Sequence, residues 1–357
     1  MIFFAAIQLC NPVFRASPAC ICAVHLRNVQ FCLTFGPAVF TICTVKEQSE
    51  KIIKIIGNIE AVFAGKRDVV ELALNTMISG GHLLIVDLPG VGKTTLARAL
   101  SKSIEGKTKR IQFTPDLLPT DVTGVNIYIQ AKNSFEFHPG PVFTNILLAD
   151  EINRATPRAQ SSLLEAMEEA QVSIDGSTYP VKQPFMVIAT QNPIEIQGTF
   201  PLPEAQLDRF LISAAIGYPS RADESRILDD RTGADPMDSV KPVMSLDEVE
   251  SLKESARGIR IDDSIKKYIL DITETSRRRD DVMIGASPRA SLALMFTSRT
   301  SALMEGREYV IPEDVKKLAA PTLAHRLVLR NSTRLNLEPN RAVINSILEE
   351  LPVPRPG

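Results

Sequence analysis

Three short apolar runs along the chain predict the strands of a central sheet. They lie at residues 82–86, 145–149 and 185–190, and polar or glycine-bearing sequence follows each of them. Apolar runs that are too short to cross a membrane are typical of strands buried inside a parallel sheet. Residues 96–100, after the first run, have a helical pattern instead. Strands and helices therefore alternate, which indicates an α/β fold.

Helical periodicity dominates before and after this region. An apolar face with lysines opposite is formed by Ile52, Ile53, Ile56 and Ile59. From about residue 246 to residue 315 the pattern is again helical, and Pro312 with the acids after it marks a helix start. We expect residues 246–354 to form a small all-α lid domain.

Two segments alternate between apolar and polar residues around a polar turn. They are residues 126–137 and residues 171–179, the second with Asp175 and Gly176 at its turn. This pattern predicts two β-hairpins. Such hairpins act either as passive edge ribbons or as tools that line a ring pore and contact a partner. Lys132 is the single basic residue of the first hairpin, whereas a DNA-contacting hairpin needs several.

The residues after the first apolar run have the pattern of a phosphate-binding loop. They read Leu88-Pro89-Gly90-Val91-Gly92-Lys93-Thr94-Thr95, between a predicted strand and a predicted helix. Backbone N–H groups of such a loop point inward at a helix N-terminus, where unpaired donors and the helix dipole favour an anion. Lys93 would reach the β- and γ-phosphates of a nucleotide, and the Thr94 hydroxyl would bind Mg²⁺. The predicted nucleotide-binding residues are Pro89, Gly90, Val91, Gly92, Lys93, Thr94 and Thr95.

One position departs from the usual form of this loop. The pattern G-x-x-x-x-G-K-[ST] begins with glycine, and this chain has Asp87 there. Taken alone, the segment is also compatible with an ordinary strand–loop–helix turn that carries a surface lysine. The residues after the other two predicted strands favour nucleotide binding.

Asp150 and Glu151 follow the second apolar run, at the edge where open α/β sheets bind their ligands. Asp150 is suited to hold Mg²⁺ and its waters, and Glu151 to polarise an attacking water as general base. Alternatively, the two acids only favour the dipole of a following helix. Asn192 follows the third run and is placed to orient that water, although Asn-Pro is also a common turn starter.

Two arginines further along the chain are candidates for transition-state stabilisation. They are Arg209, in Leu207-Asp208-Arg209-Phe210, and Arg289, in Ser287-Pro288-Arg289. Isolated arginines are usually solvated surface charges. Beside the phosphates, however, an arginine raises the rate by orders of magnitude.

Together these motifs resemble the MoxR family of AAA+ ATPases. The resemblance rests on Leu-Pro-Gly-Val-Gly-Lys-Thr-Thr (88–95), Ala-Asp-Glu-Ile-Asn-Arg-Ala (149–155), Ala-Thr-Gln-Asn-Pro-Ile-Glu (189–195), Pro-Leu-Pro-Glu-Ala-Gln-Leu-Asp-Arg-Phe (201–210) and Gly-Ala-Ser-Pro-Arg-Ala (285–290), which occur in this order. It extends from about residue 57 to residue 354. It implies an AAA+ P-loop domain, with a parallel sheet flanked by helices and β-hairpin inserts, followed by the helical lid.

The resemblance also implies a role for each candidate residue. The phosphate and Mg²⁺ ligands would be Lys93 and Thr94, and the Walker B pair Asp150 and Glu151. Sensor 1 would be Asn192, sensor 2 Arg289 and the arginine finger Arg209, with Arg154 and Arg158 as alternative fingers. Whether Arg289 acts in cis or from a neighbouring subunit stays open.

Composition and charge fit an enzyme-sized globular protein. The chain has 357 residues, enough for two or three domains, with 44% hydrophobic and 23% charged residues. A formal net charge of −2 gives no overall basic field for nucleic acid. No apolar run approaches the roughly 18 residues of a membrane helix, so we expect no membrane span.

Residues 1–45 differ from the rest. All five cysteines lie there, at irregular spacings that fit no zinc pattern, and no basic segment of a secretory signal precedes the first apolar residues. We interpret this stretch as an irregular, poorly packed extension rather than a redox or anchoring segment. The remaining predicted parts are an AAA+ core at 46–220, a polar connection at 221–245 and the lid. A cysteine-free core suits a reducing cytoplasm, which is the expected location.

The sequence therefore predicts an ATP-hydrolysing motor that uses ATP and Mg²⁺ and works as a homo-oligomeric ring, expected to be a hexamer. The family resemblance adds a chaperone-like role, in which the ring remodels or activates a client protein. That client often has a von Willebrand factor A domain, and the action sometimes inserts a metal or cofactor. The alternatives are a nucleic-acid motor or loader, and a nucleotide-gated switch without turnover.

Overall fold

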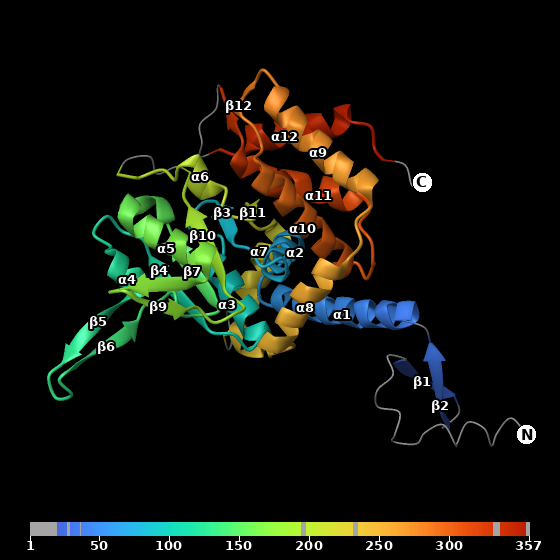
Figure 1. The fold of residues 1–357 in the computed structure, drawn as a ribbon, viewed down its shortest axis with the longest axis horizontal. Helices are drawn as coiled ribbons and strands as arrows, with labels where there is room; N and C mark the ends of the chain where they lie inside the picture. The colour runs from blue at the N-terminus through green and yellow to red at the C-terminus, as the bar shows by residue number, and fades with distance from the viewer. Residues whose placement is uncertain are drawn as a thin grey trace, which may run out of the picture.

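The computed structural model describes residues 20–26, 29–35, 37–193, 198–230, 235–330 and 336–354, with side chains from residue 45 onward. Its centre is a five-stranded sheet in the order β11–β3–β10–β7–β4 (Figure 1). The bounds are β3 Leu83–Val86, β4 Thr108–Gln112, β7 Ile146–Asp150, β10 Met186–Gln191 and β11 Ile212–Ala214. Every neighbouring pair is parallel, so all five strands end at the same edge.

Helices bury both faces of this sheet. Along β7, Ile146 and Leu148 pack on one side and Leu147 and Ala149 on the other, because side chains alternate along a strand. The first side is covered by α1 (Pro37–Glu60), α2 (Arg67–Ile78) and α3 (Lys93–Ser103), and the second by α5 (Pro157–Glu169). The continuous apolar runs in the sequence therefore mark strands that are buried on both faces.

The three predicted strands are confirmed as β3, β7 and β10, whereas β4 and β11 were not predicted. β4 is an edge strand whose side chains are mostly exposed, so it lacks an apolar run. β11 is only three residues long. Both escape a search for apolar runs, and both matter because they complete the sheet on either side.

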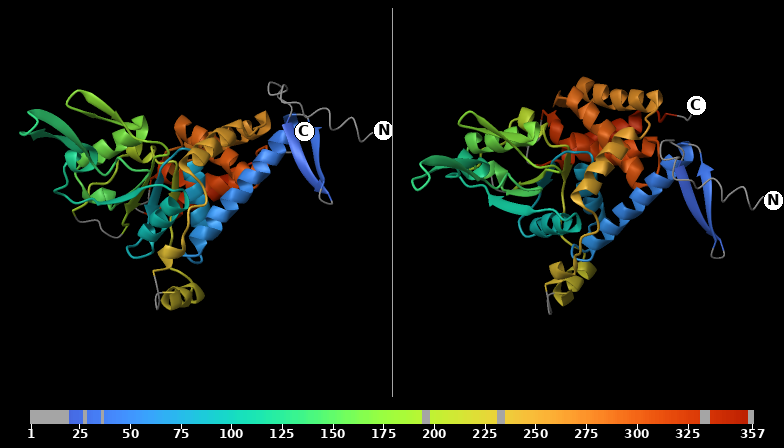
Figure 2. Two further views of the ribbon diagram at one scale, coloured as in Figure 1. Left: turned by 90° about the horizontal axis from the view of Figure 1, so that it is seen from below. Right: turned by 60° about the horizontal axis from the view of Figure 1, so that its bottom comes forward.

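Two hairpins project from the core, as the alternating patterns predicted (Figure 2). The first pairs β5 (Gly124–Ile129) with β6 (Ser134–Pro139), after the short helix α4 (Pro119–Thr123); the second pairs β8 (Gln171–Ile174) with β9 (Ser177–Pro180). They contact each other, because the rings of Phe137 and Tyr179 stack with centroids 4.0 Å apart and the Asn126 amide donates to Asp175 at 2.8 Å.

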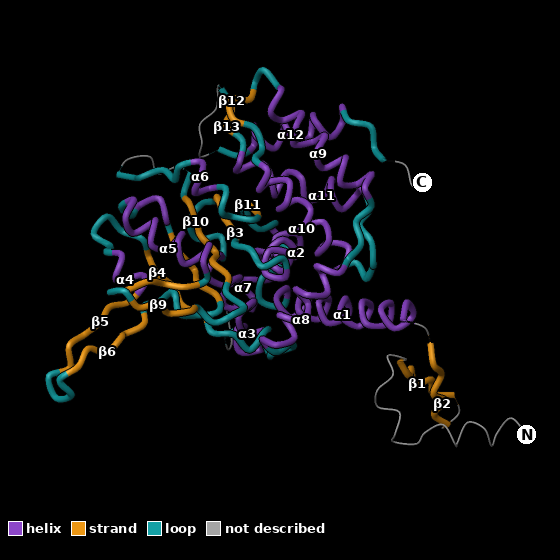
Figure 3. Tube along the Cα trace, viewed as in Figure 1, coloured by secondary structure: helices purple, strands orange, loops and turns teal. Residues whose placement is uncertain are grey.

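The lid is helical, as predicted, apart from one short strand pair (Figure 3). Its helices are α8 Leu246–Gly258, α9 Asp263–Arg278, α10 Pro288–Met304, α11 Pro312–Leu323 and α12 Glu338–Glu350, with the 3₁₀ turn η4 at Ala324–Arg326. The strand pair, β12 (Val282–Ile284) with β13 (Val328–Leu329), is the departure from an all-α lid. Side chains of Ser245, Asp262 and Ser287 cap the N-termini of α8, α9 and α10.

The remaining segments contain more regular structure than the sequence pattern indicated. The predicted connection holds the helix α7 (Arg221–Asp230) and the turn η3 (Pro236–Ser239). Within the predicted extension, β1 (Cys20–Leu26) pairs with β2 (Val29–Phe35), and α1 begins at Pro37. Residues 1–19 and all five cysteine side chains lie outside the part described. No described helix is both long and apolar enough to span a membrane.

Candidate active site at the carboxyl edge of the sheet

The loop between β3 and α3 has the backbone geometry of an anion-binding turn. Gly90 and Gly92 adopt positive φ angles of 85° and 96°, which favour glycine. Gly92 also caps α3, and no side chain accepts a hydrogen bond there. The N–H groups of the first turn of α3 are therefore available to an anion, which the helix dipole favours as well.

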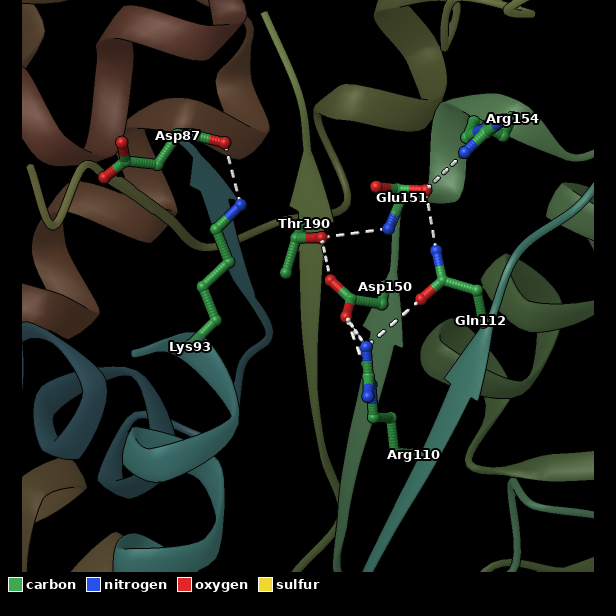
Figure 4. A network of polar contacts seen from close by, with 8 residues as sticks. All are labelled: Asp87, Lys93, Arg110, Gln112, Asp150, Glu151, Arg154 and Thr190. Atoms are coloured by element: carbon green, nitrogen blue, oxygen red, sulfur yellow. Dashed lines mark hydrogen bonds and ion pairs between the residues drawn. The ribbon is translucent and has the colours of Figure 1, made fainter. Parts of the chain in front are cut away.

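Lys93, the first residue of α3, lies buried within this loop. Its Nζ donates to the backbone oxygen of Asp87 at 2.7 Å (Figure 4). Burial lowers the pKa of Lys93, and the carboxylates of Asp150, Asp87 and Glu151 oppose that shift. A bound phosphate would supply the negative partner that this buried ammonium favours.

Asp87 explains why this loop does not begin with glycine. Its buried carboxylate accepts backbone N–H bonds from Leu88 at 2.7 Å, from Ile216 at 2.5 Å and from Gly217 at 2.6 Å. Asp87 therefore ties the start of the loop to the segment that follows β11. The position serves as an anchor with ordinary backbone angles, so it does not need glycine.

Asp150 and Glu151, at the end of β7, are held by residues of both neighbouring strands (Figure 4). From β10, Thr190 Oγ1 donates to Asp150 at 2.6 Å and accepts from the backbone N–H of Glu151 at 2.9 Å. From β4, Arg110 pairs with the other oxygen of Asp150 at 2.7 Å. The backbone of Glu151 is left-handed, with φ 55°, a strained state that tends to occur at functional sites.

The Glu151 carboxylate has two polar partners on a single oxygen. Gln112 Nε2 donates to Oε2 at 2.7 Å, and Arg154 Nη1 donates to the same oxygen at 3.0 Å. Sequence reasoning missed Arg110, Gln112 and Thr190, because their part in the site follows from strand order. Arg154, an alternative arginine finger, instead contacts the Glu151 of its own chain.

The predicted phosphate and acid residues line one cavity of about 320 Å³. Its lining is Pro89, Gly90, Gly92, Lys93, Thr94, Arg110, Gln112, Asp150, Glu151 and Asn192. A second cavity of about 260 Å³ shares Gly90 and Gly92 with the first and is also lined by Val62, Phe63, Val91, Thr95 and Ile216 among others. The Lys93, Thr94 and Asp150 side chains suit the first cavity to phosphates, and the Val62 and Phe63 side chains give the second an apolar wall that suits a nucleobase.

The two candidate arginines lie together but do not line either cavity. Arg209 Nη2 pairs with Glu168 Oε2 at 2.9 Å, and Arg289 Nη2 pairs with the other oxygen of the same carboxylate. Arg158, the remaining alternative finger, is exposed at the start of α5. The structure thus separates the arginines from the phosphate site of their own chain.

Comparison with known proteins identifies the family of this chain. Residues 82–212 match the "ATPase family associated with various cellular activities (AAA)", and residues 274–347 match the "AAA lid domain". The chain is 40% identical to "Chaperone MoxR1" of Mycobacterium tuberculosis over 85% of its own length and 82% of that protein. This chain belongs to the MoxR family of AAA+ ATPases.

Two further proteins are similar to most of this chain. "Uncharacterized protein YeaC" of Bacillus subtilis is 47% identical, over 84% of this chain and 94% of that protein. A solved structure, of a protein from Cytophaga hutchinsonii described as a candidate ATPase, superposes with a TM-score of 0.82 at 34% identity. It covers 90% of this chain and 100% of that one. The AAA+ domain followed by a helical lid is therefore shared along nearly the whole chain.

Proposed function

We propose that this MoxR-family chain hydrolyses ATP with the help of Mg²⁺. The observation that carries the proposal is the single cavity that gathers Lys93, Thr94, Asp150, Glu151 and Asn192 from the ends of three parallel strands. The hard oxygen donors of Thr94 and Asp150 fit Mg²⁺, which is usually bound by one or two carboxylates together with phosphates. When bound, Mg²⁺ would neutralise charge on the β- and γ-phosphates.

The other steps, which are phosphate binding, orientation of the attacking water and proton transfer, would fall to side chains and backbone groups of this chain. The loop N–H groups and Lys93 bind the phosphates, and Asn192 orients the attacking water. Glu151 takes the proton from that water through Oε1, because Gln112 and Arg154 both bond to Oε2. Phe63 and Val62 contact the base in the neighbouring cavity.

We further propose that Arg209 and Arg289 act on the ATP of an adjacent subunit in a homo-oligomeric ring, expected to be a hexamer. Their separation from the cavity of their own chain supports this arrangement. An arginine supplied in trans adds orders of magnitude to the rate, so an isolated subunit would turn over slowly.

The proposed biological role is chaperone-like: the ring remodels or activates a client, for which a protein with a von Willebrand factor A domain is a candidate. The exposed aromatic side chains of Tyr128 and Phe135, 50% and 71% exposed, give the first hairpin an apolar surface for such contacts. Lys132 pairs with Glu136 on the same hairpin, which disfavours a nucleic-acid motor. We expect the protein in the cytoplasm, where ATP is supplied.

The decisive test measures ATPase rate against protein concentration for the wild type and for Glu151→Gln. We expect the specific activity to rise with concentration, because a neighbour completes the site, and Glu151→Gln to lower kcat by about a hundredfold or more. A rate independent of concentration would contradict the ring mechanism. Tight ATP binding without phosphate release at any concentration, with or without a client, would instead favour the nucleotide-gated switch.

A further inference from the structure

The structure brings together two arginines that are far apart in the sequence. Glu168, near the end of α5, pairs one carboxylate oxygen with Arg209 and the other with Arg289. The hydrogen bond from Arg289 holds the pKa of Glu168 below its usual range, so the carboxylate is ionised at neutral pH. All three side chains are substantially exposed, however, and exposed ion pairs contribute little to fixing a geometry.

A second carboxylate, Asp208, joins the backbones that carry these arginines. Asp208 directly precedes Arg209, and its Oδ2 accepts a hydrogen bond from Ser287 Oγ at 2.9 Å. Ser287 is the N-cap of α10, two residues before Arg289. The other oxygen of Asp208 forms an ion pair with Arg326 Nε at 2.8 Å, and the Arg326 side chain is only 2% exposed.

Side chains of the lid segment around Arg326 also bond to the backbone of residues 208–210. Arg326 Nη2 donates to the carbonyl oxygen of Phe210 at 2.7 Å and to that of Asp208 at 3.2 Å. His325, the preceding residue of η4, contacts the Phe210 oxygen through Nε2 at 2.9 Å. Residues 208–210 are therefore bound from two parts of the lid, at the start of α10 and at η4.

We propose that Asp208 is a positioning residue, which fixes Arg209 and Arg289 as one rigid pair for delivery to the nucleotide of the neighbouring subunit. The inference rests on the proposed trans action of these arginines. Asp208 lines neither the phosphate cavity nor the neighbouring cavity of its own chain, so its effect passes through the arginines. A partly buried carboxylate that bonds to Ser287 on one oxygen and pairs with the buried Arg326 on the other is suited to this task. Displacing a catalytic group by about 1 Å can lower a rate a hundredfold.

The lid contains a matched control of the same chemistry. Asp314 is 4% exposed and, like Asp208, accepts from a serine hydroxyl and pairs with an arginine: Ser301 Oγ at 3.0 Å and Arg307 Nη2 at 2.6 Å. Its remaining bonds, from Arg307 Nη1 at 2.8 Å and from the backbone N–H of Ile311 at 2.9 Å, also stay within the lid. Asp314→Ala therefore removes an equivalent buried ion pair without touching the arginine pair.

The first experiment compares Asp208→Ala with Asp314→Ala in the full-length protein. We expect Asp208→Ala to lower kcat about tenfold while the KM for ATP changes less than about twofold, since the binding cavity is untouched. Asp314→Ala should lower thermal stability but keep kcat within about twofold. Asp208→Asn should restore part of the rate, because the amide can still bond to Ser287 and present an oxygen to Arg326. Equal losses of kcat in the two alanine variants would overturn the proposal.

The second experiment mixes two inactive variants of the chain and adds Asp208→Ala to only one of them. A chain with Arg209→Ala and Arg289→Ala keeps its phosphate loop, and a chain with Lys93→Ala keeps its arginines, so mixed rings should recover activity. Adding Asp208→Ala to the Lys93→Ala chain should reduce the recovered rate about tenfold, and adding it to the other chain should leave that rate unchanged. If Asp208→Ala itself is unstable, Asp208→Asn takes its place, and a smaller reduction confined to the same placement is then expected.

The possible outcomes separate the inference from the function on which it rests. Equal effects in both placements would show a general structural defect and refute the positioning role. No recovery even with native Asp208, in mixtures shown to assemble, would refute the trans action of the arginines and the inference with it. A loss confined to the arginine-donating chain supports both.

Discussion

Arg110 occupies one carboxylate oxygen of Asp150, the residue proposed to hold Mg²⁺. The guanidinium lies 2.7 Å from Asp150 Oδ2, and about half of its surface is exposed. Exposed pairs of this kind contribute about 0.2–1 kcal/mol. Arg110→Gln should therefore lower the Mg²⁺ concentration at half-maximal ATPase activity about two- to fivefold.

This prediction is checked by titrating Mg²⁺ at fixed ATP in the wild type, Arg110→Gln and Lys109→Gln. Lys109 precedes Arg110 on β4, but its Nζ bonds to the Gly140 carbonyl instead of a site carboxylate, so its variant should titrate like the wild type. An unchanged or increased Mg²⁺ requirement in Arg110→Gln would show that the arginine does not compete with the ion.

For single residues, the sequence alone identifies those site residues whose roles follow from local spacing in the chain. Lys93 and Thr94 follow a glycine loop, and Asp150 ends an apolar run, so each can be found without knowing the fold. Arg110 and Gln112 contact the Asp150–Glu151 pair only because β4 lies beside β7. That adjacency follows from sheet order, which one sequence does not specify.

Among the elements, the two hairpins were predicted separately but lie packed against each other. The ring of Phe137 stacks on Tyr179 of the second hairpin, with centroids 4.0 Å apart, and meets the ring of Phe143 edge-on at 5.3 Å. Phe135, near the tip of the first hairpin, contacts only the ring of Tyr128 among the described aromatic pairs and is 71% exposed. The alternating pattern predicts each hairpin, but it does not show which aromatic residues join them.

This difference predicts contrasting effects for two substitutions on the same strand. Phe137→Ala should lower the local opening free energy of β5–β6 by about 1–2 kcal/mol, because it removes two aromatic contacts, and Phe135→Ala by less than about 0.5 kcal/mol. Hydrogen exchange of the backbone amides in residues 124–139 measures this directly. Equal protection in the two variants would mean that the stack does not stabilise the first hairpin.

At the scale of the whole molecule, one apolar cluster joins the core to the lid. It includes Leu83 and Ile85 of β3, Ile52 of α1, and Leu294 and Leu318 of the lid helices α10 and α11. Separating the two parts would expose this surface at a cost of about 25 cal/mol per Å². The continuity favours a core and lid of one chain that move together.

Two buried histidines connect the parts of this fold and make its stability depend on pH. His82 links β10 to α5: its Nδ1 accepts from the backbone N–H of Val187 at 3.0 Å, so Nε2 carries the proton toward the Met167 oxygen, also at 3.0 Å. Burial lowers the pKa of His82 to about 4, with a smaller contribution from Lys253. His325 lies between lid and core, and burial, together with the nearby charge of Arg326, lowers its pKa to about 3.

Both histidines stay neutral in the folded protein at pH values where the unfolded chain, with a pKa near 6.5, takes up protons. As pH falls from 7 to 5, each should therefore lower the free energy of unfolding by roughly 2 kcal/mol, or about 4 kcal/mol together. Urea unfolding at pH 7 and pH 5 measures this. His82→Gln and His325→Gln should each remove about half of the difference. Because the carboxylates with lowered pKa, such as Glu71 and Glu168, titrate below this window, a full pH effect in the double variant would contradict the histidine origin.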